Sequence, residues 1–172
     1  GKGLPDPIDY RDLPYTWRGG FFEMDIDLLK SRLTDAHLVL GDLADTVPHF
    51  FESAPAPVGF VAIDLDYYSS TVDALRLFEG DEAFLLPRVI CYLDDIVGED
   101  HVFQHDFVGE LLAVHEFNDR NANRKIGRIN ALGQKRAVAA PWCESMFAVH
   151  LFEHPLYGKY VGPPREAQQL PL

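Results

Sequence analysis

Two short apolar runs stand out along the chain, and each is followed directly by acidic residues. The first spans 58–63 and precedes Asp64-Leu65-Asp66, and the second spans 89–93 and precedes Asp94-Asp95. Continuous apolar runs of this length are typical of strands buried in a parallel sheet. Between them, apolar residues recur at helical spacing over 69–79. The pattern therefore predicts a βαβ unit in which the strand at 58–63 is buried on both faces.

Weaker patterns on either side of this unit extend the prediction to one α/β domain over residues 1–153. We expect helices at 24–33, 45–53 and 107–117, and strands at 37–40, 125–132 and 146–152. The last two strands are expected to pair with each other. The first 20 residues are rich in Pro, Gly, Asp and aromatic residues, which predicts an ordered loop. The proline-rich residues 154–172 predict an irregular C-terminal tail.

The acidic residues that follow the two runs are predicted to lie together. In a right-handed βαβ unit, both parallel strands end at the same edge of the sheet, where ligands of open α/β sheets bind. Asp64 should therefore be a neighbour of Asp94-Asp95, and clustered carboxylates favour a hard divalent cation such as Mg²⁺ or Ca²⁺. An equally weighted alternative is that these acids only cap helices and hydrate the strand ends. Asp66 directly precedes a helix, so we assign it to the start of that helix.

Composition narrows the classes of partner. The sequence has 27 acidic and 15 basic residues, a formal net charge of −12, and no segregated basic patch, so no nucleic acid or anionic membrane partner is expected. It has no signal-peptide pattern and no apolar run long enough to cross a bilayer, which favours a cytoplasmic protein. Cys91 and Cys143 are far apart in sequence and are expected to be reduced packing residues. A homo-oligomer is compatible with these features.

Other residues that can carry chemistry have structural interpretations. Ser69, Ser70 and Thr71 lie at the start of a predicted helix without a histidine partner nearby in sequence, so we interpret them as capping residues. His101 and His105 have the spacing of two metal ligands on one helix face. They precede a predicted helix rather than lie in it, and we interpret them as surface residues.

Three motifs follow one another along the chain. They are Gly41-Asp42-Leu43-Ala44-Asp45-Thr46-Val47-Pro48, the stretch 61–75 that contains Asp64-Leu65-Asp66-Tyr67-Tyr68-Ser69-Ser70-Thr71, and Leu93-Asp94-Asp95. Together they resemble the motifs after the third strand and at the ends of the fourth and fifth strands of the macrocin-type (TylF-like) class I O-methyltransferases. Gly3-Leu4-Pro5 is similar to a tripeptide that follows the second strand of that family. The resemblance extends from Gly3 to the predicted helix at 107–117.

The resemblance implies a Rossmann-like three-layer sheet and methyl transfer from S-adenosylmethionine to a hydroxyl group of a small molecule. By it, Asp64, Asp94 and Asp95 would bind a divalent metal ion, with Mg²⁺ expected, that orients adjacent oxygens of the acceptor and helps one hydroxyl to lose its proton. Asp64 would also be the catalytic carboxylate. Gly41 and Asp42 would lie near the adenine ring of the cofactor.

Two departures from the family qualify these expectations. The spacing between Asp64 and Asp94-Asp95 is a few residues longer than in the family, and Glu79-Gly80-Asp81-Glu82 is the expected insertion. In addition, no acid-x-Gly-x-Gly turn follows a strand, so the first two strands of the family and their cofactor-binding turn are missing from this sequence. We therefore expect a fragment of a longer chain. In this fragment the strand at 37–40 would have no neighbour on the side where the missing strands belong, and an apolar edge would be exposed.

Two other functions fit parts of the pattern. Strands that end in Asp64-Leu65-Asp66 and Asp94-Asp95 are also similar to the nucleophile and metal-binding motifs of Mg²⁺-dependent phosphatases of the haloacid dehalogenase type. Tyr68 occupies the position at which that class has a hydroxyl residue, so we rank the phosphatase below the methyltransferase. The third reading is a methyltransferase-like binding module without catalysis.

Overall fold

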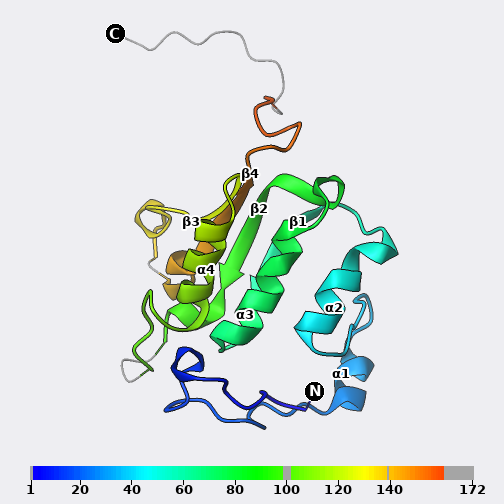
Figure 1. Ribbon diagram of the computed structural model, residues 1–172, viewed down its shortest axis with the longest axis vertical. Helices are drawn as coiled ribbons and strands as arrows, with labels where there is room; N and C mark the ends of the chain where they lie inside the picture. Colours follow the sequence, from blue (N-terminus) through cyan, green and yellow to red (C-terminus); the bar gives the residue numbers. More distant parts are fainter. Residues whose placement is uncertain (1, 99–101, 139, 161–172) are drawn as a thin grey trace.

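The computed structural model describes residues 2–98, 102–138 and 140–160. They form an α/β fold with a four-stranded mixed sheet of order β1-β2-β4-β3 (Figure 1). The strands are β1 (Val58–Ile63), β2 (Leu85–Leu93), β3 (Arg124–Arg128) and β4 (Met146–Leu151). β1 and β2 are parallel, whereas β4 runs antiparallel to both β2 and β3. The predicted pairing of the last two strands is therefore confirmed.

The α-helices of the described residues lie beside this sheet. They are α1 (Ile26–Arg32), α2 (Leu43–His49), α3 (Tyr68–Leu75) and α4 (Gly109–Arg120). Helices α3 and α4 pack side by side against the sheet, and α2 lies beside α3 (Figure 1). The predicted βαβ unit is confirmed as β1-α3-β2. No helix in the described part of the chain is both long and apolar enough to cross a membrane.

One face of the sheet is covered more completely than the other. Along β2, Val89, Cys91 and Leu93 are buried, whereas Arg88 is exposed and Ile90 is half-buried. The buried side chains form one core with apolar residues of α3 and α4 and the turns beside them, namely Leu75, Phe78, Ala113, Val114 and Phe117. Both cysteines are buried and free, as expected, and burial raises the pKa of the Cys91 thiol to about 12. The α/β class is confirmed, and the four-stranded mixed sheet is compatible with a Rossmann-like fold.

The expectation that β1 is buried on both faces is wrong. In the described residues β1 pairs only with β2, so it is an edge strand. Phe60, in the middle of β1, is 58% exposed. The composition of the run 58–63 indicates a high propensity for strand formation. It does not indicate how many neighbouring strands the run has, so an edge strand and a central strand look alike in the sequence.

The predicted strand at 37–40 is also absent from the sheet. Residues 37–40 have no helical or strand assignment, and Val39 and Leu40 are exposed. A strand requires a hydrogen-bonded neighbour, and the described residues provide none for this segment. Its β-branched and apolar residues therefore lie in a segment that is not paired with the sheet.

Most other predicted elements are present with shifted ends. The predicted helix 45–53 is α2 followed by a 3₁₀ turn at Phe50–Ser53, and Pro48 lies in the last turn of α2. The predicted helix 69–79 is α3 followed by a 3₁₀ turn at Arg76–Glu79. The predicted strand 125–132 ends earlier, at Arg128. Residues 154–160 form turns, as predicted for the tail, and 161–172 lie outside the described residues.

The N-terminal loop is anchored to the start of α3 by one buried carboxylate. Asp12 is fully buried, and its Oδ1 accepts a hydrogen bond from the Ser69 amide at 2.8 Å. Its Oδ2 accepts from the Ser69 hydroxyl at 3.0 Å and from the Ile8 amide at 2.9 Å. The expected capping by serine and threonine is therefore wrong, since Ser69 donates to Asp12 and Thr71 donates to the Tyr67 carbonyl. The acceptor that caps α3 comes from a distant loop.

Candidate metal centre

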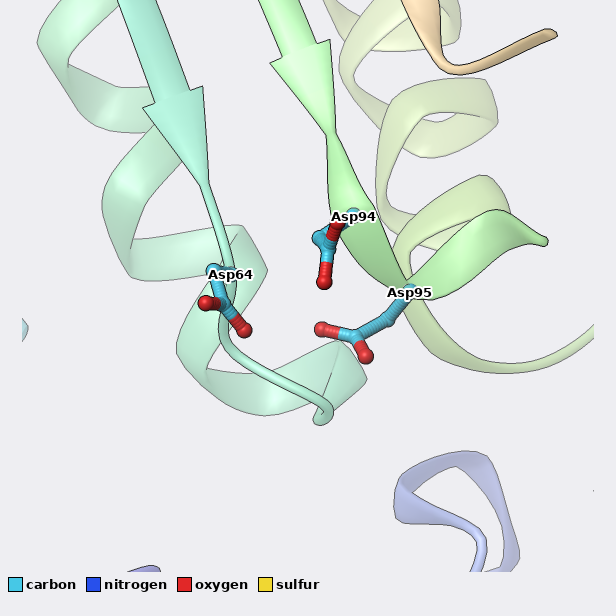
Figure 2. A group of neighbouring side chains, drawn as sticks. All are labelled: Asp64, Asp94 and Asp95. Carbon is cyan, nitrogen blue, oxygen red and sulfur yellow. The ribbon is translucent and has the colours of Figure 1, made fainter. Parts of the chain in front are cut away.

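Asp64, Asp94 and Asp95 converge at the carboxyl ends of the two parallel strands (Figure 2). Ile63 pairs with Leu93, so the residue after β1 and the first residue after β2 stand at the same level of the sheet. Each of the three carboxylates offers one oxygen within 4.8 Å of the others. The structure thus brings these predicted site residues together, and the parallel register of the βαβ unit is the reason.

Asp95 is the most firmly held of the three. Its Oδ2 accepts hydrogen bonds from the backbone amides of Leu65 at 3.1 Å and Asp66 at 2.8 Å. These bonds fasten the chain that leaves β1 to the end of β2. Burial raises the pKa of the Asp95 carboxyl, and the negative charge of Asp64 adds to this rise, whereas the amide of Asp66 opposes it. Since Oδ2 is engaged by the backbone, Oδ1 is the oxygen left for a ligand.

Asp94 and Asp64 are more exposed than Asp95. The Tyr92 hydroxyl donates a hydrogen bond to Oδ1 of Asp94, and this bond raises the pKa of the tyrosine. No hydrogen-bond donor in the described part of the chain reaches the side chain of Asp64. Both oxygens of Asp64 are therefore free of hydrogen bonds from the described residues, and one of them points toward Asp95 (Figure 2).

Asp66, expected at the entry of the helix, directly precedes the N-cap residue Tyr67 of α3 and also lines the acidic pocket. It has a left-handed backbone with φ of 58° and is only 8% exposed. Its side chain makes no cap bond to α3, whose N-cap residue Tyr67 also provides none. Burial raises the pKa of the Asp66 carboxyl to about 7, and the charges of Asp95 and Asp64 add to the rise. Asp66 is thus partly protonated near neutral pH.

Glu110 lies behind the acidic group and was missed in the sequence. It is fully buried in the first turn of α4, and its Oε2 accepts a hydrogen bond from the Asp95 amide at 3.2 Å. Burial raises its pKa to about 9, with a further contribution from the charge of Asp95, so Glu110 is protonated at neutral pH. A signal was present, because Glu110 shares a helix face with Val114 and Phe117 at spacings of four and seven.

A pocket of about 540 Å³ opens in front of these carboxylates. One wall is acidic and the other is apolar, formed largely by the N-terminal loop. The lining residues are Gly3, Leu4, Trp17, Phe22, Met24, Asp64, Asp66, Asp94 and Asp95. This lining contains no lysine, arginine or histidine, so no basic side chain on the walls balances the acidic charge.

The residues present fit a divalent cation. Carboxylate oxygens are the ligands that Mg²⁺ and Ca²⁺ prefer in proteins. Three carboxylates held within a few ångströms of one another repel unless a proton or a cation is shared. Asp64, Asp94 and Asp95 each have an oxygen that is not occupied by the hydrogen bonds described above. A cation between these oxygens would satisfy both the charge and the ligand chemistry.

The residues expected to contact the cofactor lie elsewhere. Gly41 lines a separate groove of about 810 Å³ between α2 and β1, and Asp42 is the N-cap residue of α2 without a side-chain cap bond. Neither residue lines the acidic pocket. A smaller cavity of about 260 Å³ has both Leu43 and Asp64 in its lining.

The remaining sequence expectations concern histidines. His105 is exposed, and its Nδ1 accepts a hydrogen bond from the Phe107 amide at 3.1 Å, so it closes a turn. His101 lies outside the described residues. Within the part of the chain that the structure describes, the one group of acids, histidines and cysteines close enough to share a metal ion is Asp64, Asp94 and Asp95.

Comparisons with known proteins do not place the chain in a family. No protein-family model matches the sequence, and no curated protein and no solved structure matches it. The macrocin-type resemblance therefore stays a prediction from three motifs.

Proposed function

We propose that this protein binds a divalent metal ion at Asp64, Asp94 and Asp95 and uses it to activate a hydroxyl group of a small molecule for methyl transfer from S-adenosylmethionine. The observation that carries the proposal is the group of three carboxylate oxygens within 4.8 Å at the ends of two parallel strands. The metal site is supported by this geometry. The choice of methyl transfer is supported by the motif resemblance alone.

Each acidic residue has a distinct part in this proposal. The metal ion would supply Lewis acidity and a template for two adjacent oxygens of the acceptor. Asp64, whose oxygens receive no hydrogen bond from the described residues, accepts the hydroxyl proton. The amides of Leu65 and Asp66 hold Asp95 in a fixed orientation, and the Tyr92 hydroxyl holds Asp94. Such supporting hydrogen bonds keep ligands in place before the ion arrives.

A phosphatase of the haloacid dehalogenase type is the second candidate, and one observation favours it. Asp66 lies two residues after Asp64 and lines the same pocket, so a second carboxyl group is available there as a general acid. Against this candidate, the pocket lining has no basic side chain to hold a phosphate, and its four acids repel one. We therefore rank this candidate below methyl transfer.

Calorimetric titration with MgCl₂ tests the metal site. We expect wild-type protein to bind Mg²⁺ and Asp94→Asn to bind it at least about tenfold more weakly, because one charged ligand is lost. Asp35→Asn is the matched control, since Asp35 is exposed and lies outside the pocket lining. Absence of Mg²⁺ binding to the wild type, or equal loss in both variants, would contradict the proposed metal site.

Titration with S-adenosylmethionine then separates the candidate functions. Binding of this cofactor supports methyl transfer. Mg²⁺ binding without cofactor binding, together with Mg²⁺-dependent hydrolysis of p-nitrophenyl phosphate, supports the phosphatase. Mg²⁺ binding with neither of these outcomes supports the non-catalytic binding module.

A further inference from the structure

The pocket in front of the acids has two walls of opposite character, and this contrast limits what can bind there. Every charged side chain in its lining is a carboxyl group, from Asp64, Asp66, Asp94 or Asp95. The other lining side chains are apolar or aromatic. A ligand that fills the pocket must therefore be polar along one edge and apolar over the rest of its surface.

The acidic wall extends beyond the three candidate metal ligands to Asp66. Asp66 is only 8% exposed and lines the pocket, and its carboxyl lies within hydrogen-bond reach of the Asp95 carboxyl. Carboxylate oxygens accept hydrogen bonds from hydroxyl groups. The acidic wall therefore suits a ligand edge that carries hydroxyl groups.

The apolar wall is built from aromatic rings that are held in place. The Trp17 and Phe22 rings pack at 5.7 Å between centroids with a tilt of 59°. Trp17 donates its backbone amide to the Leu13 carbonyl at 3.0 Å and packs on the cluster of Leu13, Val102 and Val108. Asp12 anchors the same loop to α3. The wall is therefore part of the folded structure and does not need to form when a ligand binds.

Phe22 has a backbone conformation that its side chain does not favour. Its φ is 61°, in the left-handed region, and its ring is 59% exposed while it lines the pocket. Bulky residues rarely adopt this conformation, and positions that keep it are concentrated at ligand sites. This backbone conformation suits a wall that meets a ligand.

We infer that the acceptor is an uncharged planar ring with two adjacent oxygens on one edge, bound with these oxygens at the acids and its ring face against Trp17 and Phe22. This inference rests on the proposed function, because the metal ion would hold the two oxygens. A polyhydroxylated sugar fits less well, since its remaining hydroxyl groups would face Leu4, Phe22 and Met24 without partners. An anionic ring would be repelled by the four acids.

Catechol is the probe for this inference, and its binding is measured in saturating MgCl₂. The sequence has two tryptophans, Trp17 and Trp142. In a Trp142→Phe background, Trp17 is the sole indole, so its fluorescence reports contact with the wall, and calorimetry gives the affinity independently. We expect catechol to quench Trp17 and to bind more tightly than methyl mannoside, which carries a cis-diol on a saturated ring, and than 3,4-dihydroxybenzoate, which is anionic.

Variants of the wall complete the test. Phe22→Ala should weaken catechol binding about tenfold, because stacking with one ring is lost. Tyr10→Ala is the matched control, since Tyr10 is an exposed aromatic residue of the same loop outside the pocket lining, and it should leave the affinity unchanged. Both variants alter exposed rings, so the fold should be retained.

The outcomes separate this inference from the proposed function. Mg²⁺ binding that is lost in Asp94→Asn, together with catechol binding that is unaffected by Phe22→Ala or weaker than mannoside binding, overturns the ring inference and keeps the metal site. Failure of catechol to bind to the Mg²⁺-loaded protein also overturns the ring inference. Failure of Mg²⁺ to bind overturns the proposed function itself. Catechol binding that is weakened by Phe22→Ala and unchanged by Tyr10→Ala, in a protein that binds Mg²⁺, supports both this inference and the proposed function.

Discussion

The two parallel strands that precede the acids both contain an apolar run, but they have different neighbours in the sheet. β2 pairs with β1 on one side and β4 on the other, and Val89, Cys91 and Leu93 are buried. β1 pairs with β2 alone, and Phe60 is exposed beside the groove that separates β1 from α2. The comparison teaches that an apolar run specifies a strand, whereas the neighbours of that strand decide how much of the run is buried.

Truncation of one apolar side chain in each strand is the strongest test of this comparison. Leu93→Ala should cost about 3 kcal/mol of unfolding free energy, because Leu93 is fully buried and a cavity remains. Phe60→Ala should cost less than about 1 kcal/mol, because most of its ring already contacts solvent. Urea unfolding of both variants measures the difference. Equal losses would show that β1 is as buried as β2 in solution.

Glu110 gives a smaller effect that depends on pH. Its carboxyl has a pKa of about 9 in the folded protein against an ordinary value of 4.5, so the folded state holds a proton that the unfolded state loses between these values. The unfolding free energy should therefore decrease as pH rises from about 5 to about 9, by at most about 1.4 kcal/mol per pH unit. Asp66 and Asp95 act in the same direction.

Glu110→Gln should flatten this pH dependence, and urea unfolding at a series of pH values measures it. Glutamine retains an oxygen that can accept from the Asp95 amide but has no proton to lose. Glu23→Gln is the matched control, because Glu23 is exposed, and it should leave the slope unchanged. If the unfolding free energy depends on pH equally in wild type and Glu110→Gln, Glu110 is already ionised, and therefore hydrated, in the folded protein.

Residues 37–40, which precede β1 in the sequence, should be the region whose stability is least sensitive to substitution. Val39→Pro should change the unfolding free energy by less than about 1 kcal/mol, because residues 37–40 form no strand and proline removes only an amide that no ladder uses. Hydrogen exchange of the amides of 37–40 should likewise be fast. A loss of about 3 kcal/mol would indicate that this segment pairs with another strand, and would make β1 resemble β2 more closely.

The sequence was sufficient for the parts of the fold that depend on local pattern and on chirality. The βαβ unit follows from two apolar runs and an intervening helical period, and the approach of Asp64 to Asp94 and Asp95 follows from the shared edge of parallel strands. The edge position of β1 could not be predicted, because it depends on which chain lies beside it. The same reason explains the unpaired chain at 37–40.

The parts of the site that were missed depend on contacts between distant residues. Asp66 looked like the start of a helix, and its place in the pocket depends on a left-handed turn and on the Asp95 carboxylate. Glu110 was not singled out in the sequence, and its burial depends on how α4 packs on the rest of the core. The apolar wall depends on Asp12, which no local pattern connects to Ser69.

The hydrogen bonds between Asp12 and Ser69 also have a consequence for how the protein folds. They join residues that are 57 positions apart, so the first turn of α3 obtains its cap only after a long loop has closed. The entropy of loop closure rises slowly with length, but contacts of this separation form late and slow the search for the native state. The start of α3 and the aromatic wall of the pocket should therefore become ordered in the same kinetic step, after the βαβ unit has formed.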